Sequence, residues 1–133
     1  MGRDSMQESQ PRFGAILIVE DLPRFWRPLK NELRASGLFS KVTVAQSVSE
    51  AEFRFQNLES VSGVLMDACL SGEKPDTLEL TRKIRETHGY DGIIIAMSRD
   101  SSFRRFQLQA GCSHESTKED AARYLMSLLL RSP

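Results

Sequence analysis

Five polar side chains that could act together chemically lie at or near the ends of short apolar runs. They are Glu20 and Asp21 after AILIV, Asp67 after GVLM, Ser98 after GIIIAM, and Lys118 near the end of the chain. Three neighbouring carboxylates repel one another, and a hard cation such as Mg²⁺ relieves that repulsion. A nearby ammonium and hydroxyl would help to neutralise a phosphoryl group in transfer. Because an ionised aspartate can itself attack phosphorus, Asp67 is a candidate nucleophile.

The histidines and cysteines do not support other nucleophilic chemistry. His88 precedes the apolar run at 92–97 and His114 opens a later segment, so neither has the position of a triad base. Cys69 and Cys112 have no evident base, and two cysteines fit neither a disulfide framework nor a zinc site. We expect both thiols to be reduced and to lie at opposite ends of the sheet.

Each candidate residue also has a purely structural interpretation. Glu20 and Asp21 could cap the helix that follows them, and Asp67 could be an inert acid at a strand end. Ser98 could cap the next helix, alone or in addition to a functional role. Lys118 could be a solvated residue at the start of a helix.

Apolar patterns predict the elements that position these side chains. Strands are predicted at 15–19, 41–45, 63–66, 92–97 and, weakly, near 114–116. Helices are predicted at about 23–35, from the capping box at 47–50 to Leu58, around 80–84, around 103–110, and from 117 or 118 to 130. Five such units predict an α/β fold with a parallel, doubly wound sheet. Since ligands bind beyond the carboxyl ends of such strands, the five polar residues should converge on one crevice.

Two predicted helices carry apolar stripes that should face the core. In the first, Phe25, Leu29 and Leu33 lie four residues apart, although Pro28 should delay or kink that helix. In the fourth, the predicted stripe consists of Phe103, Phe106 and Ala110.

Length and charge favour one folded domain with a polar tail. A chain of 133 residues is long enough to form one hydrophobic core. We expect residues 1–12 to be a disordered tail. Residues 1–5 are typical of an expression leader that precedes a start at Met6. The chain has 18 Lys and Arg residues and 18 Asp and Glu residues, so its formal net charge is zero. A zero net charge argues against sequence-independent binding to nucleic acid. No apolar run approaches the roughly 20 residues that span a membrane, and no secretory signal is evident. We therefore expect a cytoplasmic protein.

Four segments resemble one known family. ILIVEDLP, VLMDACLSG, IIIAMSRD and AGCSHESTKED, in this order and spacing, resemble the CheY-like receiver domain of two-component response regulators. The resemblance covers about residues 14–130 and implies a domain at 13–131. It also implies a flavodoxin-like fold with five parallel strands in the order 2-1-3-4-5.

The resemblance implies a phosphoacceptor and a metal site. Asp67 would take a phosphoryl group from a histidine kinase or a phosphotransfer protein. Asp21 would bind Mg²⁺ directly, Glu20 would assist through water, and Asp67 with the backbone carbonyl of Cys69 would complete the protein ligands. The domain would then be a phosphoacceptor, capable at most of self-phosphorylation and autodephosphorylation, and not an enzyme acting on other substrates.

The remaining motif positions include departures from the family pattern. Ser98 takes the place of the family's switch hydroxyl and Lys118 that of its phosphate-binding lysine. Arg99 stands where a small residue is usual, Glu115 where an aromatic ring is usual, and Glu119 where a proline is usual. These departures leave the phosphorylation set complete and argue against the usual switch.

Glu115 should remain at the surface. Burying an ionised carboxylate without a partner costs several kcal/mol, which exceeds the gain from burying a ring. We expect Glu115 to pair with one of three nearby cations, which are Arg99, Arg104 and Arg105.

Two functional classes follow from this comparison. The first is a phosphoryl-accepting signalling domain, with a downstream protein partner at the face of the fourth helix, fifth strand and fifth helix and without direct nucleic-acid or membrane binding. The second is a degenerate receiver that binds a partner without regulated phosphorylation. A third class, a phosphatase with an aspartate nucleophile, would need a second carboxylate two residues after Asp67. Cys69 stands at that position, so we discount this class.

Overall fold

Five parallel strands form one sheet in the order β2-β1-β3-β4-β5. The computed structural model describes residues 10–131, so most of the predicted tail lies outside the described residues. The strands are β1 (Phe13–Val19), β2 (Phe39–Ala45), β3 (Val61–Met66), β4 (Ile94–Ala96) and β5 (His114–Glu115). The predicted α/β class and strand order are confirmed.

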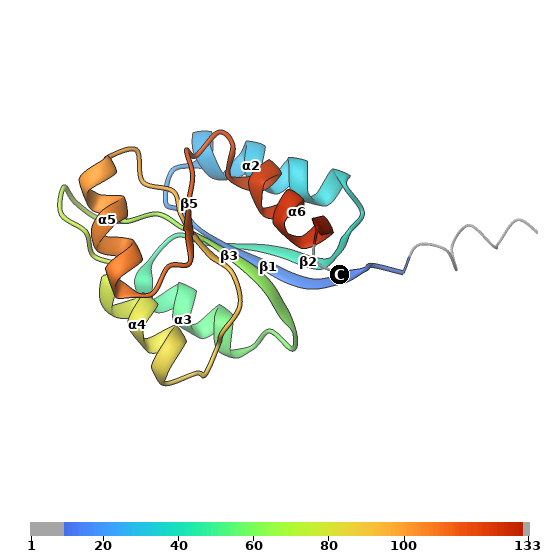
Figure 1. Cartoon of the computed structure of the whole chain (residues 1–133), viewed down its shortest axis with the longest axis horizontal. Coiled ribbons are helices and arrows are strands. Elements are labelled where there is room, and N and C mark those ends of the chain that lie inside the picture. Colours follow the sequence, from blue (N-terminus) through green and yellow to red (C-terminus); the bar gives the residue numbers. More distant parts are fainter. Residues whose placement is uncertain (1–9, 132–133) are drawn as a thin grey trace, which may run out of the picture.

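Five helices cover the two faces of this sheet (Figure 1). One face carries α2 (Pro23–Ala35) and α6 (Ala121–Arg131). The other carries α3 (Val48–Gln56), α4 (Leu78–Glu86) and α5 (Ser101–Ala110). None of the described helices is long and apolar enough to cross a membrane.

Strand β1, which lies between β2 and β3, supplies side chains to both core layers. Successive side chains of a strand point to opposite faces, so Ile16 and Ile18 pack with Leu29 of α2 while Leu17 and Val19 join the layer under α3, α4 and α5. These four β1 side chains are fully buried. Because β1 is buried on both faces, the chain segment that follows it begins inside the molecule.

Helix α2 begins at Pro23 and continues through Pro28, so the predicted delay of this helix is wrong. Pro28 lacks the N–H that would donate to the carbonyl of Arg24, and both residues are exposed, so water can satisfy that carbonyl. Leu29 and Leu33 on the other side are buried against the sheet. Packing therefore maintains the helix at the cost of one hydrogen bond.

Three details of the predicted helices were wrong. The last helix begins at Ala121 because residues 118–120 form a turn, in which the Asp120 amide donates to Thr117 Oγ1. In α5 the buried residues are Gln107 and Ala110, whereas Phe106 is exposed. Helix α3 ends before Leu58, which packs beside the core from the loop.

Candidate functional site

The carboxyl ends of β1, β3 and β4 bring the predicted site residues to one edge of the sheet. The Asp67 amide donates to the Val19 carbonyl at 3.0 Å, and the Met97 amide donates to the Met66 carbonyl at 3.1 Å. These bonds extend the pairing one residue past the strands. Consequently the residues that follow β1, β3 and β4 lie side by side.

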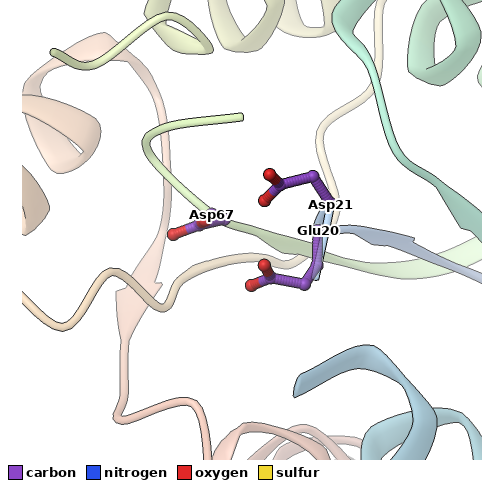
Figure 2. Close-up of side chains that lie close together, drawn as sticks. All are labelled: Glu20, Asp21 and Asp67. Atoms are coloured by element: carbon purple, nitrogen blue, oxygen red, sulfur yellow. The ribbon is translucent and has the colours of Figure 1, made fainter. Parts of the chain in front are cut away.

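Three carboxylates form a cluster at this edge. Glu20, Asp21 and Asp67 each offer an oxygen, and these oxygens lie within 4.8 Å of one another (Figure 2). Glu20 is fully buried and Asp67 is 5% exposed. A set of close carboxylate oxygens fits a hard divalent cation, as the sequence predicted.

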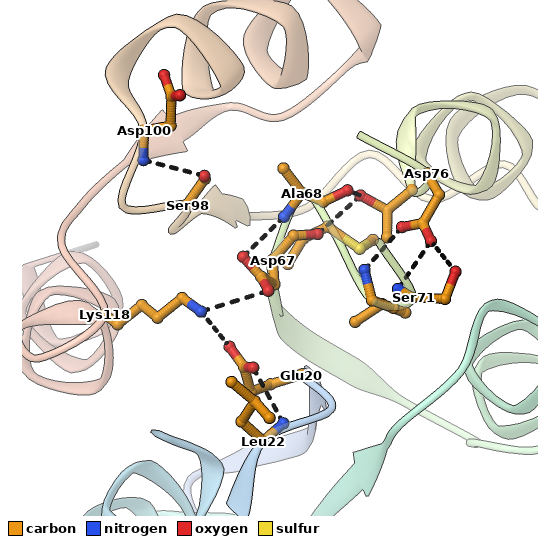
Figure 3. A network of polar contacts seen from close by, with 12 residues as sticks. Glu20, Leu22, Asp67, Ala68, Ser71, Asp76, Ser98, Asp100 and Lys118 are labelled. Atoms are coloured by element: carbon orange, nitrogen blue, oxygen red, sulfur yellow. Dashed lines mark hydrogen bonds and ion pairs between the residues drawn. The ribbon is translucent and has the colours of Figure 1, made fainter. Parts of the chain in front are cut away.

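Lys118 lies between two of these carboxylates. Its Nζ is 2.8 Å from Glu20 Oε1 and 3.3 Å from Asp67 Oδ2 (Figure 3). The lysine is only 6% exposed, so the interpretation as a solvated residue is wrong. The turn at 118–120, which delays α6, leaves its side chain directed into the site.

Burial shifts the protonation of the two inner carboxylates. Desolvation raises the pKa of Glu20 from 4.5 to about 7. The hydrogen bond from Lys118 lowers this pKa but does not cancel the effect of desolvation. Desolvation also raises the pKa of Asp67, and the charge of Lys118 opposes that shift. Two buried acids thus share one ammonium, which leaves negative charge for a metal ion to balance.

The loop after β3 is held in place by its own hydrogen bonds. Thr77 Oγ1 donates to the Asp67 carbonyl at 2.7 Å, and the Asp67 side chain accepts from the Ala68 amide at 2.9 Å. Asp76 accepts from the amides of Leu70 and Ser71. This network orients the backbone around Cys69, whose carbonyl is the last predicted metal ligand.

Ser98 lies beside the site but does not cap α5. Its hydroxyl accepts from the Asp100 amide at 3.2 Å, while the Asp100 carboxylate caps the helix through the amides of Ser102 and Phe103. The Ser98 carbonyl accepts from Arg104 Nη1 at 2.7 Å. At the start of α2 the N-cap residue Leu22 makes no side-chain cap hydrogen bond, but its amide donates to Glu20 Oε2 at 3.2 Å, so Glu20 also contacts the start of this helix.

These residues open onto a cavity of about 410 Å³. Its lining includes Asp21, Asp67, Cys69, Ser98 and Lys118. Both cysteines are free, and burial raises the pKa of Cys69 to about 11 and that of Cys112 to about 12. Neither thiol is therefore a ready nucleophile at neutral pH.

Sequence reasoning missed two residues at this cavity. Phe25, assigned to the core face of α2, lines the cavity together with Arg24, and Arg99, already noted beside Ser98, lines it as well. The Phe25 ring centroid is 4.2 Å from Lys118 Nζ. The local sequence feature that could have indicated this role is that Phe25 lies one helical turn after the acidic pair. The spacing of Phe25 from the other apolar residues of α2 indicated a core position instead.

Comparison with known proteins gives structural matches only. No protein-family model and no curated protein matches the sequence. Among solved structures, a Clostridium difficile two-component response regulator has a TM-score of 0.73 and 20% identity, covering 89% of this chain and 97% of that one. The receiver domain of the Francisella response regulator 1452 has a TM-score of 0.69 and 16% identity, covering 90% and 98%. A CheY-like receiver domain from Methanospirillum hungatei JF-1 has a TM-score of 0.68 and 24% identity, covering 89% and 91%.

These matches define the fold of the chain. It has the fold of the response-regulator receiver domains, in agreement with the resemblance of its four sequence segments.

Proposed function

We propose that this chain is a receiver domain that accepts a phosphoryl group on Asp67 from a histidine kinase or a phosphotransfer protein. The observation that carries the proposal is the buried cluster in which Lys118 Nζ lies 3.3 Å from Asp67, with two further carboxylates beside it. A solvent-protected carboxylate with a fixed cation is suited to phosphoryl transfer, since that reaction depends mainly on positioning and electrostatics.

The proposed step is an in-line displacement. An Asp67 oxygen forms a bond to phosphorus while the bond from phosphorus to the donor imidazole nitrogen breaks, and the imidazole keeps the electron pair and is protonated. Lys118 offsets the negative charge of the transferred group, and the Ser98 hydroxyl can donate to one of its oxygens. Ionised Asp67 is the reactive form, so the raised pKa that burial causes opposes reaction at low pH.

Mg²⁺ belongs to the same proposal. Asp21 and Asp67 would hold it directly, Glu20 would assist, and the Cys69 carbonyl would add a neutral ligand. When bound, the ion would supply positive charge that screens the carboxylates from the incoming phosphoryl group. The fit rests on the donor set, because three carboxylate oxygens lie close together with one lysine to balance them.

A small-molecule donor provides the direct test. Acetyl phosphate with Mg²⁺ should add one phosphoryl group to the wild-type chain, and hydroxylamine should remove it, as expected for an acyl phosphate. Asp67→Asn should abolish the modification, whereas Asp91→Asn, an exposed aspartate before β4, should leave it intact. A phosphate mapped to any other residue would overturn the assignment.

A second candidate is a receiver that binds its partner without phosphorylation. The ion pair between Arg104 and Glu115 favours this candidate, because Glu115 stands where the family resemblance implies a mobile aromatic ring. In that case the wild-type chain would remain unmodified by acetyl phosphate or by a kinase, and partner binding would be equal in Asp67→Asn. In either role we propose a cytoplasmic site of action and a protein partner at the face of α5, β5 and α6.

A further inference from the structure

Three cations surround the ring of Phe25. Lys118 Nζ lies 4.2 Å from the ring centroid, the Arg24 guanidinium carbon 5.0 Å and the Arg99 guanidinium carbon 5.6 Å. The face of an aromatic ring attracts cations, and the attraction is greater where water is excluded. Because Lys118 is buried, its contact with Phe25 should be the strongest of the three.

Within residues 10–131 the two arginines have no acidic partner. Among residues 10–131, neither Arg24 nor Arg99 forms an ion pair or a side-chain hydrogen bond, unlike Arg104. Both line the cavity onto which Asp67 opens, as do the acids Glu73 and Asp100. Their charges are therefore available to a ligand in that cavity.

The phosphorylated site carries more negative charge than Lys118 and one divalent cation would balance. When all three are ionised, Glu20, Asp21 and Asp67 exceed the charge of Lys118 by two, which one divalent cation would balance. Phosphorylation replaces the single charge of Asp67 with about two charges. The excess falls on the outer phosphoryl oxygens, which would enter the cavity that Arg24 and Arg99 line.

We propose that Arg24, Arg99 and Lys118, held around Phe25, form an anion-binding half of this site. Phe25 is a positioning residue for Lys118, and the two arginines bind the outer phosphoryl oxygens. A charge-assisted hydrogen bond to such an oxygen is stronger than an exposed contact with a ring, so either guanidinium can exchange one for the other. The inference rests on the proposed function, because the anion it describes is the group on Asp67.

Beryllofluoride, a phosphoryl mimic, tests the two arginines on the full chain with Mg²⁺. Fluorine NMR titration should show binding about tenfold weaker in Arg24→Gln and in Arg99→Gln, the usual effect of losing one charge-assisted bond. Arg27→Gln is the matched control, because Arg27 lies in the same helix but contacts Trp26 at 5.5 Å and does not line the cavity. Its affinity should equal that of the wild type.

Metal affinity provides a readout that a merely structural defect would not reproduce. Without the anion, Arg24→Gln and Arg99→Gln should bind Mg²⁺ as tightly as the wild type or more tightly, because a repelling cation is gone. Anion affinity should thus fall while metal affinity stays equal or rises. A parallel loss of both would overturn the proposal.

Two substitutions test Phe25. Phe25→Leu removes the ring and should weaken beryllofluoride binding about fivefold, whereas Phe25→Tyr keeps the ring and should restore it. The proton shifts of the Lys118 side-chain terminus should lose their ring-current displacement in Phe25→Leu and keep it in Phe25→Tyr. Unchanged shifts and affinity in Phe25→Leu would overturn the positioning role.

The outcomes separate this inference from the proposed function. A wild-type chain that binds no beryllofluoride and accepts no phosphoryl group would overturn both. A wild-type chain that binds it, with Arg24→Gln and Arg99→Gln equal to Arg27→Gln, would overturn the anion-binding half and leave Asp67 as the phosphoacceptor.

Discussion

Arg104 Nε donates to Glu115 Oε1 at 2.9 Å and so joins α5 to β5. The same guanidinium donates to the Ser98 carbonyl at 2.7 Å, which connects this surface pair to the edge of the site. The prediction that Glu115 is exposed and paired with an arginine is confirmed, and Arg104 is the partner. Arg99, which was an equal candidate, lies on Phe25 instead.

The Arg104–Glu115 pair should contribute little to stability. The Glu115 side chain is 49% exposed, so water and salt screen the interaction, and a double-mutant cycle with Arg104→Gln and Glu115→Gln should give a coupling below about 1 kcal/mol. Urea unfolding at low and high salt measures it, and the coupling should nearly vanish at high salt. Arg105→Gln should be neutral, and a salt-independent coupling would contradict the screened geometry.

Activation should remodel the face of α5, β5 and α6 only slightly. Glu115 has no favourable buried position to move into, so a phosphoryl mimic on Asp67 should act through Arg104 and the Ser98 carbonyl. Amide chemical shifts of the wild type with beryllofluoride should change modestly on this face and less at high salt. A large, salt-independent change would show that another element moves.

Metal binding should depend on the acidic cluster. Asp21→Asn and Asp67→Asn should each lower Mg²⁺ or Mn²⁺ affinity by about tenfold or more, since each removes a charged oxygen ligand. Calorimetry, or the fluorescence of the half-buried Trp26, measures this. Asp91→Asn is the control, and unchanged affinity in both site variants would refute the metal site.

Removal of Lys118 should destabilise the fold. Lys118→Met leaves two buried carboxylates without their cation, and breaking such a pair costs about 3–5 kcal/mol. The loss, measured by urea unfolding, should be largest above neutral pH and smaller in mild acid, where the carboxylates protonate. Lys83→Met, which breaks an exposed pair with Glu52, should cost under about 1 kcal/mol, and an equal loss in the two variants would contradict the buried geometry.

Without metal, stability should fall as pH rises from 4.5 towards 7. Burial raises the pKa of Glu20 to about 7, so in this range the folded chain binds more protons than the unfolded chain. The stabilisation is complete below the ordinary pKa of 4.5 and is lost as the pH passes through about 7. Urea unfolding with a chelator should show this slope in the wild type and a flatter one in Glu20→Gln. Equal slopes would assign the pH dependence to other groups.

Local patterns in the sequence were sufficient for the α/β class and for most of the site, whereas the strand order came from the family resemblance. The aliphatic run before Glu20 and the one before Asp67 predicted buried parallel strands, and parallel strands present their carboxyl ends on one edge. The convergence of Glu20, Asp21, Asp67, Ser98 and Lys118 follows from that geometry alone. The burial of Lys118 does not, because it depends on where the turn before α6 packs.

What the sequence determined by itself was therefore the order of the elements and the residues at the strand ends, both of which depend on neighbours along the chain. The tertiary structure alone decided that Pro28 is tolerated within α2, that Phe25 faces the cavity, and that Arg104 pairs with Glu115. It also decided the pKa of Glu20, which desolvation sets. These features depend on contacts between separate helices, strands and loops, and the free energy of such contacts comes from burial and from the partner that packing supplies.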